Sequence, residues 1–243
     1  MKLVWLTDIH LNFLKKENRI DLYREIIATY TDGVVISGDI AEATSIELIL
    51  KEMASAIAKP IYFVLGNHDY YMGSIDYVRS KMCSLTKDEP FLFWLPASGP
   101  QKLIDNTVLV GHDCFADGRY GHYANSPIVL NDSRMIVELL QSSTLGKYQL
   151  LKKMQQLADQ DAKELQKSIE DAVSAYHPKK VIILIHVPPF KEVCMHEGKI
   201  SNDDYLPFFS SKITGEILVH AAQSYPEIEF LALCGHTHSK GLF

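Results

Sequence analysis

Cysteine is scarce in this sequence and is not arranged for metal binding. The four cysteines are Cys83, Cys114, Cys194 and Cys234, and no two of them form a C-x-x-C pair. Without such pairs or a regular spacing, the sequence predicts neither a zinc knuckle nor a disulfide framework. We therefore expect reduced thiols.

Clustered positive charge and long apolar segments are also lacking. The formal net charge is -6, and no run of lysine or arginine is long enough to follow a phosphate backbone, so nucleic acid is disfavoured as a partner. The apolar stretch over residues 3–6 is too short for a signal-peptide core or a membrane span. We expect a cytoplasmic protein without a membrane partner, and the sequence does not indicate its oligomeric state.

Short apolar runs alternate with helical patterns in the first third of the chain. Strand-like runs at 3–6, 34–37 and 61–65 are separated by amphipathic segments at 21–30 and 45–58. This β-α-β-α-β order predicts a parallel sheet that binds ligands at the carboxyl ends of its strands. With 243 residues, 47% hydrophobic, and no internal repeat or linker, we predict a single domain over residues 1–243.

The rest of the chain is less regular. Short strands are predicted at 91–95, 102–104 and 107–110, where turn residues between them favour a hairpin-like antiparallel element. Residues 113–146 have an irregular pattern that indicates a cap or insertion, and residues 147–177 carry apolar side chains at the spacing of a long amphipathic helix. A strand at 181–185, an irregular loop at 188–209, a helix at 213–224 and a strand at 229–234 are expected to follow.

Both ends of the chain carry polar residues two positions apart, each pair directly after an apolar run. Asp8 and His10 follow the first run, and His236 and His238 follow the last. Side chains two apart in an extended chain point the same way, so each pair can converge on one site. These residue types predict a metal centre assembled from distant segments.

Three further motifs end strand-like runs between these pairs: Gly38-Asp39, Gly66-Asn67-His68-Asp69 and His186. A single carboxylate such as Asp39 can supply one oxygen to each of two cations, and imidazoles with the Asn67 carbonyl oxygen can complete the ligand sets. Mixed nitrogen and oxygen sets suit zinc, manganese, iron or cobalt better than calcium. Each aspartate alone could be a cap or turn residue, and His186 a core histidine, but all five motifs would then have to coincide.

In this order and context, the motifs resemble those of the calcineurin-like metallophosphoesterase superfamily, over residues 8 to 238. The resemblance implies a four-layer α/β/β/α sandwich of two mixed sheets around two divalent or mixed-valence ions of manganese, iron or zinc. It implies hydrolysis of a phosphate ester by a hydroxide that bridges the metals. One metal is then held by Asp8, His10, Asp39 and His238, and the other by Asp39, Asn67, His186 and His236.

Residues around these ligands are expected to assist catalysis. The resemblance implies that His68 protonates the leaving oxygen or stabilises the transition state, and Asp69 is expected to accept the other ring proton of His68. His112 and Asp113, after the strand at 107–110, and Arg119 in the next loop are candidate substrate contacts, because arginine suits phosphate recognition. An ordinary solvated loop is the alternative.

Departures from known subfamilies narrow the substrate class. Asp39 is followed by Ile-Ala-Glu, and not by the Val-Asp-Arg-Gly of Ser/Thr protein phosphatases. Glu42 stands where purple acid phosphatases carry a tyrosine, and the H-x-H-x-D-H cluster of metallo-β-lactamases is absent. What remains resembles cyclic-nucleotide phosphodiesterases, nucleases and small-molecule phosphatases.

The substrate is therefore expected to be a small phosphomonoester or phosphodiester, with nucleotides among the candidates. A nuclease of the same superfamily and a non-catalytic metal- or nucleotide-binding module remain alternatives. Relatives usually continue past the last histidine with strands that complete the second sheet, whereas this sequence ends at Phe243. Either the chain is truncated or its second sheet closes differently.

Overall fold

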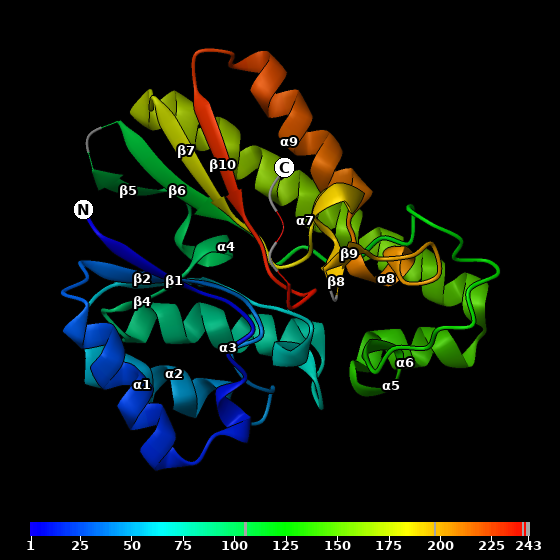
Figure 1. Cartoon of the computed structure of the whole chain (residues 1–243), viewed down its shortest axis with the longest axis horizontal. Coiled ribbons are helices and arrows are strands. Elements are labelled where there is room, and N and C mark those ends of the chain that lie inside the picture. The colour runs from blue at the N-terminus through cyan, green and yellow to red at the C-terminus, as the bar shows by residue number, and fades with distance from the viewer. Residues whose placement is uncertain (105, 197, 240, 242–243) are drawn as a thin grey trace.

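Two four-stranded sheets lie face to face with helices on their outer sides (Figure 1). The computed structural model describes residues 1–104, 106–196, 198–239 and 241. The first sheet has the strand order β1-β2-β3-β4 and the second has the order β10-β7-β6-β5. This arrangement is the predicted four-layer sandwich.

The first sheet is parallel throughout its described strands. It is formed with its helices by β1 (Leu3–Leu6), α1 (Lys16–Ala28), β2 (Gly33–Ser37), α2 (Ile46–Ile57), β3 (Ile61–Val64), α3 (Ile75–Asp88) and β4 (Leu92–Trp94). The predicted β-α-β-α-β order is confirmed, although α1 begins five residues before the expected segment. The helix α3 was not predicted from the sequence. The prediction that β4 belongs to an antiparallel hairpin is wrong, since β4 pairs in parallel with β3.

The second sheet is mixed, as expected. The first sheet was also expected to be mixed, but its described strands are all parallel. It contains β5 (Gln101–Ile104), β6 (Thr107–Gly111), β7 (Lys180–Leu184) and β10 (Glu229–Leu233), with α4 (Leu95–Ser98), α7 (Lys147–Tyr176) and α9 (Lys212–Ser224) beside it. Only β5 runs antiparallel to its neighbour. The predicted hairpin therefore corresponds to β5 and β6, and the predicted long helix corresponds to α7.

Alternation of side chains along the strands separates the hydrophobic cores. In β2, Val34 and Ile36 pack against the helices of the first sheet, whereas Val35 faces the second sheet with Leu109 and Leu184. Neighbouring residues of a strand point to opposite faces, so one strand serves two cores. A third core lies between β6, β7 and the helices α7 and α9.

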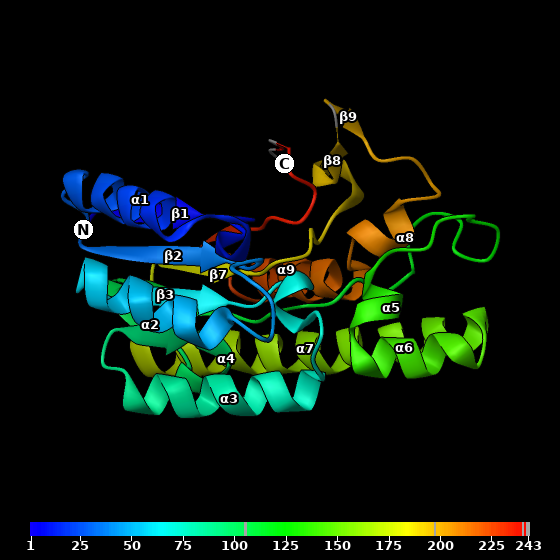
Figure 2. The ribbon, with the colours of Figure 1, turned by 90° about the horizontal axis from the view of Figure 1, so that it is seen from below.

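The segment predicted as a cap is not irregular throughout. It contains α5 (Asp132–Met135) and α6 (Val137–Thr144), which lie beside the amino-terminal part of α7 (Figure 2). The predicted loop over 188–209 contains a short hairpin, β8 (Met195–His196) with β9 (Lys199–Ile200), and α8 (Leu206–Phe209). None of the described helices combines the length and apolarity that a bilayer crossing requires.

Candidate metal centre

The strand ends of both sheets meet at one place. Asp8 and His10 follow β1, Asp39 follows β2, Asn67 follows β3, His186 follows β7, and His236 and His238 follow β10. Backbone hydrogen bonds join these segments, from His10 N–H to the Asp39 carbonyl at 2.9 Å and from Gly235 N–H to the His186 carbonyl at 2.9 Å. The structure thus brings all seven predicted ligands together.

Six of these residues form two groups that share one member. The first group is Asp8, His10, Asp39 and His238, and the second is Asp39, His186 and His236, with one ligand atom per residue lying within 4.8 Å of the others in its group. Oδ2 of Asp39 lies 3.8 Å from Nε2 of His10, and Oδ1 lies 3.4 Å from Nε2 of His186. The two oxygens of one carboxylate therefore face different groups.

Backbone carbonyls fix the tautomers of two histidines. Nδ1 of His186 donates to the Ser37 carbonyl at 2.8 Å, and Nε2 of His236 donates to the Phe208 carbonyl at 3.0 Å. Burial lowers the pKa of both rings, which favours the neutral forms. Each neutral ring then carries its proton on the carbonyl side, and its other nitrogen presents a lone pair to the site.

Asn67 faces those two nitrogens with its oxygen. Its Nδ2 donates to Oδ1 of Asp132 at 2.8 Å and lies 3.2 Å from the Tyr71 hydroxyl, which fixes the orientation of the amide. Oδ1 of Asn67 lies 3.1 Å from Nε2 of His186 and 3.1 Å from Nδ1 of His236. The Asn67 oxygen, Nε2 of His186 and Nδ1 of His236 thus converge, and none of the three atoms carries a proton. Their three lone pairs fit a bound metal ion, which would accept all of them.

Two carboxylates, those of half-buried Asp8 and buried Asp39, lie close together. Burial and the neighbouring Asp8 raise the pKa of Asp39 well above its ordinary value. Burial also raises the pKa of Asp8, but hydrogen bonding and charge from His238, with His186 and Thr7, bring it below its ordinary value. A multivalent cation between the carboxylates would stabilise the charged form of both, so this pair also fits a metal centre.

Five of the candidate ligands have left-handed backbone conformations. The φ angles are 52° at Asp8, 40° at His10, 53° at Asp39, 74° at His236 and 54° at His238. Such conformations are uncommon for residues with a Cβ and cluster at functional sites, where the surrounding structure holds them in place. The backbone is therefore not extended at these five residues.

Two glycines leave room for the ligands. Gly38 has a φ of 93°, and a Cβ there would lie 2.5 Å from Nδ1 of His186. A Cβ on Gly66 would collide with Oδ1 of Asp39. Glycine is therefore required at both positions, because the metal-facing side chains occupy the space that any larger residue would need.

His68 lies at the edge of the site with its ring outside both groups. Its backbone N–H donates to Oδ1 of Asp39 at 2.9 Å, and its ring centroid lies 4.6 Å from that of His10 and 4.2 Å from that of Tyr71. Burial, followed by the charge of His10, lowers the pKa of His68 to about 4. Its buried Nδ1 has no hydrogen-bond partner among the described residues.

The predicted hydrogen bond between Asp69 and His68 is wrong. Asp69 is fully buried and accepts the backbone N–H groups of Ile40, Ala41 and Gly66 at 2.7–2.9 Å. Its side chain turns inward because these three buried donors need an acceptor. Asp69 therefore clamps the loop after β2 to the loop after β3.

The structure gives no support to the predicted substrate contacts at His112 and Asp113, because both side chains are buried and already have polar partners. Asp113 accepts Leu65 N–H at 2.7 Å and the Trp94 indole at 3.0 Å. His112 is 2% exposed, and its Nε2 lies 2.9 Å from a Glu164 carboxylate oxygen.

Arg119 is committed elsewhere as well. Its guanidinium pairs with Asp117 at 3.1 Å and with Asp159 on α7 at 2.7 Å. These ion pairs hold the loop after β6 against α7, so the structure gives no support to a phosphate contact by Arg119.

Several residues that shape the site escaped the sequence analysis. Asp132 orients Asn67 from the predicted cap, and the carbonyls of Ser37 and Phe208 orient the histidines. A backbone carbonyl has no sequence signature, and Asp132 stands in a segment without recognisable periodicity. In the sequence, the only sign of a role for Asp132 is that it is a carboxylate, which can accept a hydrogen bond.

Comparisons with known proteins gave a matching family model and similar solved structures. A family model described as calcineurin-like phosphoesterase matches residues 1–240. Phosphopantetheinyl hydrolase from Mycobacterium tuberculosis aligns with a TM-score of 0.70 at 13% identity, over 98% of this chain and 83% of that one. A dimetal phosphatase from Danio rerio aligns with a TM-score of 0.57 at 16% identity, over 99% of this chain and 82% of that one. A search of curated protein sequences gave no match.

Proposed function

The chain belongs to the calcineurin-like phosphoesterase family and is a metal-dependent hydrolase of phosphate esters, and from this premise we propose which residues form its dinuclear centre. The proposal rests on one observation, that both ligand groups share Asp39 and that its two oxygens face different groups. Asp8, His10, Asp39 and His238 hold one metal. Asp39, Asn67, His186 and His236 hold the other.

The side chains prepare the site for an anionic substrate. Bound metal ions supply a hydroxide nucleophile near neutral pH and Lewis-acid stabilisation of charge on the phosphoryl oxygens. Asp8 and Asp39 are the two carboxylates in the ligand groups, so the loaded site keeps excess positive charge although the whole chain has a net charge of -6. The positive charge of the metal-loaded site favours binding of an anionic phosphate ester.

His68 serves the leaving group. Its ring lies beside that of His10 but belongs to neither ligand group, so its N–H is available to the oxygen that departs from phosphorus. Asp69 keeps this ring in place indirectly, by holding the backbone of the Gly66 turn. Asp69 is therefore a positioning residue.

The substrate class is a small phosphate ester. The acidic chain disfavours long polyanions, whose binding depends on clustered lysine and arginine. The ligand chemistry itself is compatible with both monoesters and diesters.

A substrate panel tests the proposal. Purified protein, stripped with a chelator and reloaded with manganese, zinc or iron, is assayed with p-nitrophenyl phosphate, bis-p-nitrophenyl phosphate and a cyclic nucleotide. We expect metal-dependent release of product from at least one substrate. Stoichiometric metal binding without cleavage of any of them would indicate a binding module instead, and faster cleavage of single-stranded DNA or RNA would indicate a nuclease.

A further inference from the structure

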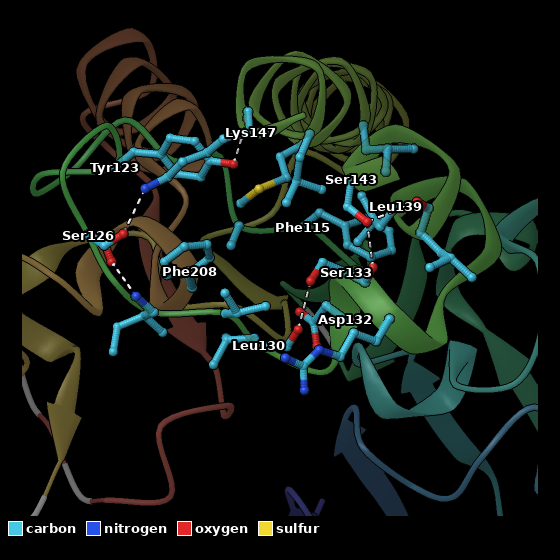
Figure 3. A pocket seen from close by; sticks show the side chains of 18 residues that line it. Phe115, Tyr123, Ser126, Leu130, Asp132, Ser133, Leu139, Ser143, Lys147 and Phe208 are labelled. Carbon is cyan, nitrogen blue, oxygen red and sulfur yellow. Dashed lines mark hydrogen bonds between the residues drawn. The ribbon is translucent and has the colours of Figure 1, made fainter. Parts of the chain in front are cut away.

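A pocket of about 370 Å³ lies between the predicted cap and the start of α7 (Figure 3), and its lining residue Asp132 contacts Asn67 of the candidate metal centre. Its volume falls in the usual range for small-molecule sites and exceeds the roughly 150 Å³ of a protein cavity that holds benzene. Protein interiors are close-packed, with few voids larger than a water molecule. A pocket of this size is therefore a candidate binding site.

The walls of this pocket are largely apolar. Phe115, Leu139 and Phe208 line it and are at least 93% buried (Figure 3). Two cations line the pocket. Arg134 is exposed, and Nζ of Lys147 donates to the Ser126 carbonyl at 2.7 Å and lies 5.3 Å from the Tyr123 ring centroid. The buried part of the wall therefore suits an apolar group.

A continuous series of contacts connects the pocket to His68. Asp132 lines the pocket, and its Oδ1 accepts the Tyr71 hydroxyl at 2.6 Å. The Tyr71 ring lies against that of His68, with centroids 4.2 Å apart. A narrower cavity of about 10 Å³ shares Phe115 and Asp132 with the pocket and is also lined by Asn67 and His236. The pocket thus lies next to the side chains that contact His68 and Asn67.

Three charged residues line the pocket: Asp132, Arg134 and Lys147. The Asp132 carboxylate accepts the amide of the metal-facing Asn67, and Nζ of Lys147 donates to a backbone carbonyl. Arg134 is exposed. The buried apolar wall is the part of the pocket that an aromatic or aliphatic tail can occupy.

Building on the proposed function, we propose that this pocket binds the apolar leaving alcohol of the substrate, which is accordingly the phosphate ester of an alcohol with an aromatic or aliphatic tail. Hydrolysis breaks the bond between phosphorus and the alcohol oxygen. Water supplies hydroxide to phosphorus and a proton to the departing oxygen, so the alcohol is released with its tail in the pocket.

The test uses primary alcohols of similar acidity but different apolar size. Ethyl, n-butyl and 3-phenylpropyl phosphates, as monoesters and as methyl diesters, are compared by kcat/KM with the metal-loaded enzyme. We expect kcat/KM to rise from ethyl to 3-phenylpropyl by roughly tenfold or more, as burial of additional apolar groups in a pocket typically produces. Equal values across the series would overturn the pocket assignment.

A pair of neighbouring serines on α6 supplies the matched variants. Ser143 lines the pocket, and Ser142 does not. Both are partly buried, and both hydroxyls lie near helix carbonyls, at 2.9 Å from Leu140 O for Ser143 and at 2.8 Å from Glu138 O for Ser142. Ser143→Phe should abolish the preference for the 3-phenylpropyl ester and leave the ethyl ester unaffected, whereas Ser142→Phe should preserve the preference.

Binding of 3-phenylpropanol to metal-free protein separates the two proposals. Titration followed by NMR should show saturable binding that Ser143→Phe removes and Ser142→Phe retains. Leu140→Ser, at an exposed position of the pocket wall, should weaken it without affecting folding. Binding of the alcohol without hydrolysis of any ester would reject the proposed function and keep the pocket. Hydrolysis without binding or size preference would reject the pocket alone.

Discussion

Nδ1 of His186 donates to the carbonyl oxygen of Ser37 at 2.8 Å. His186 follows β7 of the second sheet and Ser37 ends β2 of the first, so this hydrogen bond joins the two sheets directly beside the candidate metal centre. It also leaves Nε2 of His186 free to bind a metal, because a carbonyl oxygen can only accept. The same hydrogen bond therefore contributes to the packing of the two sheets and orients a candidate metal ligand.

Replacement of His186 should reduce the number of bound metal ions by one per chain. His186→Ala is expected to lower metal content from about two ions to about one per chain, since two-metal sites need complete ligand sets on both ions. Elemental analysis of the purified variant measures this. His220→Ala, at an exposed position on α9, is the control and should retain both ions. Unchanged content in the His186 variant would exclude the residue as a ligand.

Loss of the His68 ring should separate turnover from metal binding. His68→Asn is expected to lower kcat by roughly 10²- to 10⁴-fold, which is the usual contribution of a general acid or base. Metal content should stay at the wild-type level because the ring belongs to neither ligand group. His122→Asn, in an exposed loop, should leave both quantities unaltered. A His68 variant with full activity would remove the residue from the mechanism.

Asp132 should act on the metal through Asn67. Asp132→Ala removes the acceptor that orients the Asn67 amide, and loss of such supporting contacts typically weakens metal binding by about 10- to 100-fold. Competition with a chelating dye measures the affinity of the weaker site. Asn131→Ala alters the preceding exposed residue and should have no effect. Equal affinities in the two variants would contradict this role.

A buried charge cluster beneath the site should make stability depend on acid pH. Burial raises the pKa of Asp161, but His112 and Arg79, which contacts its carboxylate at 2.9 Å, bring it to about 2. A carboxyl whose pKa is depressed on folding stabilises the protein above its unfolded pKa, near 3.8. That contribution of about 2 kcal/mol disappears as the pH falls through 3.8 towards 2.

Asp161→Asn should therefore flatten the loss of unfolding free energy between pH 4 and pH 2, measured by urea denaturation. At pH 7 the same variant should be less stable by about 3 kcal/mol or more, since Arg79 loses a buried partner. Asp171→Asn, at an exposed position of the same helix, is the matched control. A wild-type acid profile in Asp161→Asn would show that the pair does not govern this range.

The sequence predicted the parallel first sheet because the relevant signals are local, whereas the sandwich followed from the family resemblance. The run Gly33–Ser37 is buried at every position and has an apolar centre, Val34 to Ile36, which indicates a central parallel strand, and Asp39 stands two residues after its end. Polar residues at the carboxyl ends of parallel strands share one edge of the sheet. The order of the motifs along the sequence was therefore enough to predict which residues form the candidate site.

The failures concern residues whose partners are distant in sequence. Asp69 was expected to bond to its neighbour His68, yet it caps Ile40 and Ala41 from a different loop. Asp113, which follows β6 of the second sheet, likewise accepts the N–H of Leu65, which follows β3 of the first. Buried donors recruit whichever acceptor the tertiary structure brings close, and no periodicity in the sequence encodes that choice.

The helix α3 was missed for a different reason. Its buried residues Ile75, Val78, Met82 and Leu85 recur at helical spacing, but charged and polar residues between them lower the mean hydropathy of the segment. Ser74 caps it by accepting Tyr77 N–H, which is a recognisable helix start. This element could have been found by closer attention to the cap.

The number of metal ions at which hydrolysis saturates tests the central claim most directly. Metal-free protein is titrated with manganese while bound metal and the rate of phosphate-ester hydrolysis are measured in the same samples. The sharing of Asp39 between two ligand groups predicts that activity rises to its maximum at about two ions per chain. Full activity at one ion per chain, or in metal-free protein, would contradict a centre bridged by Asp39.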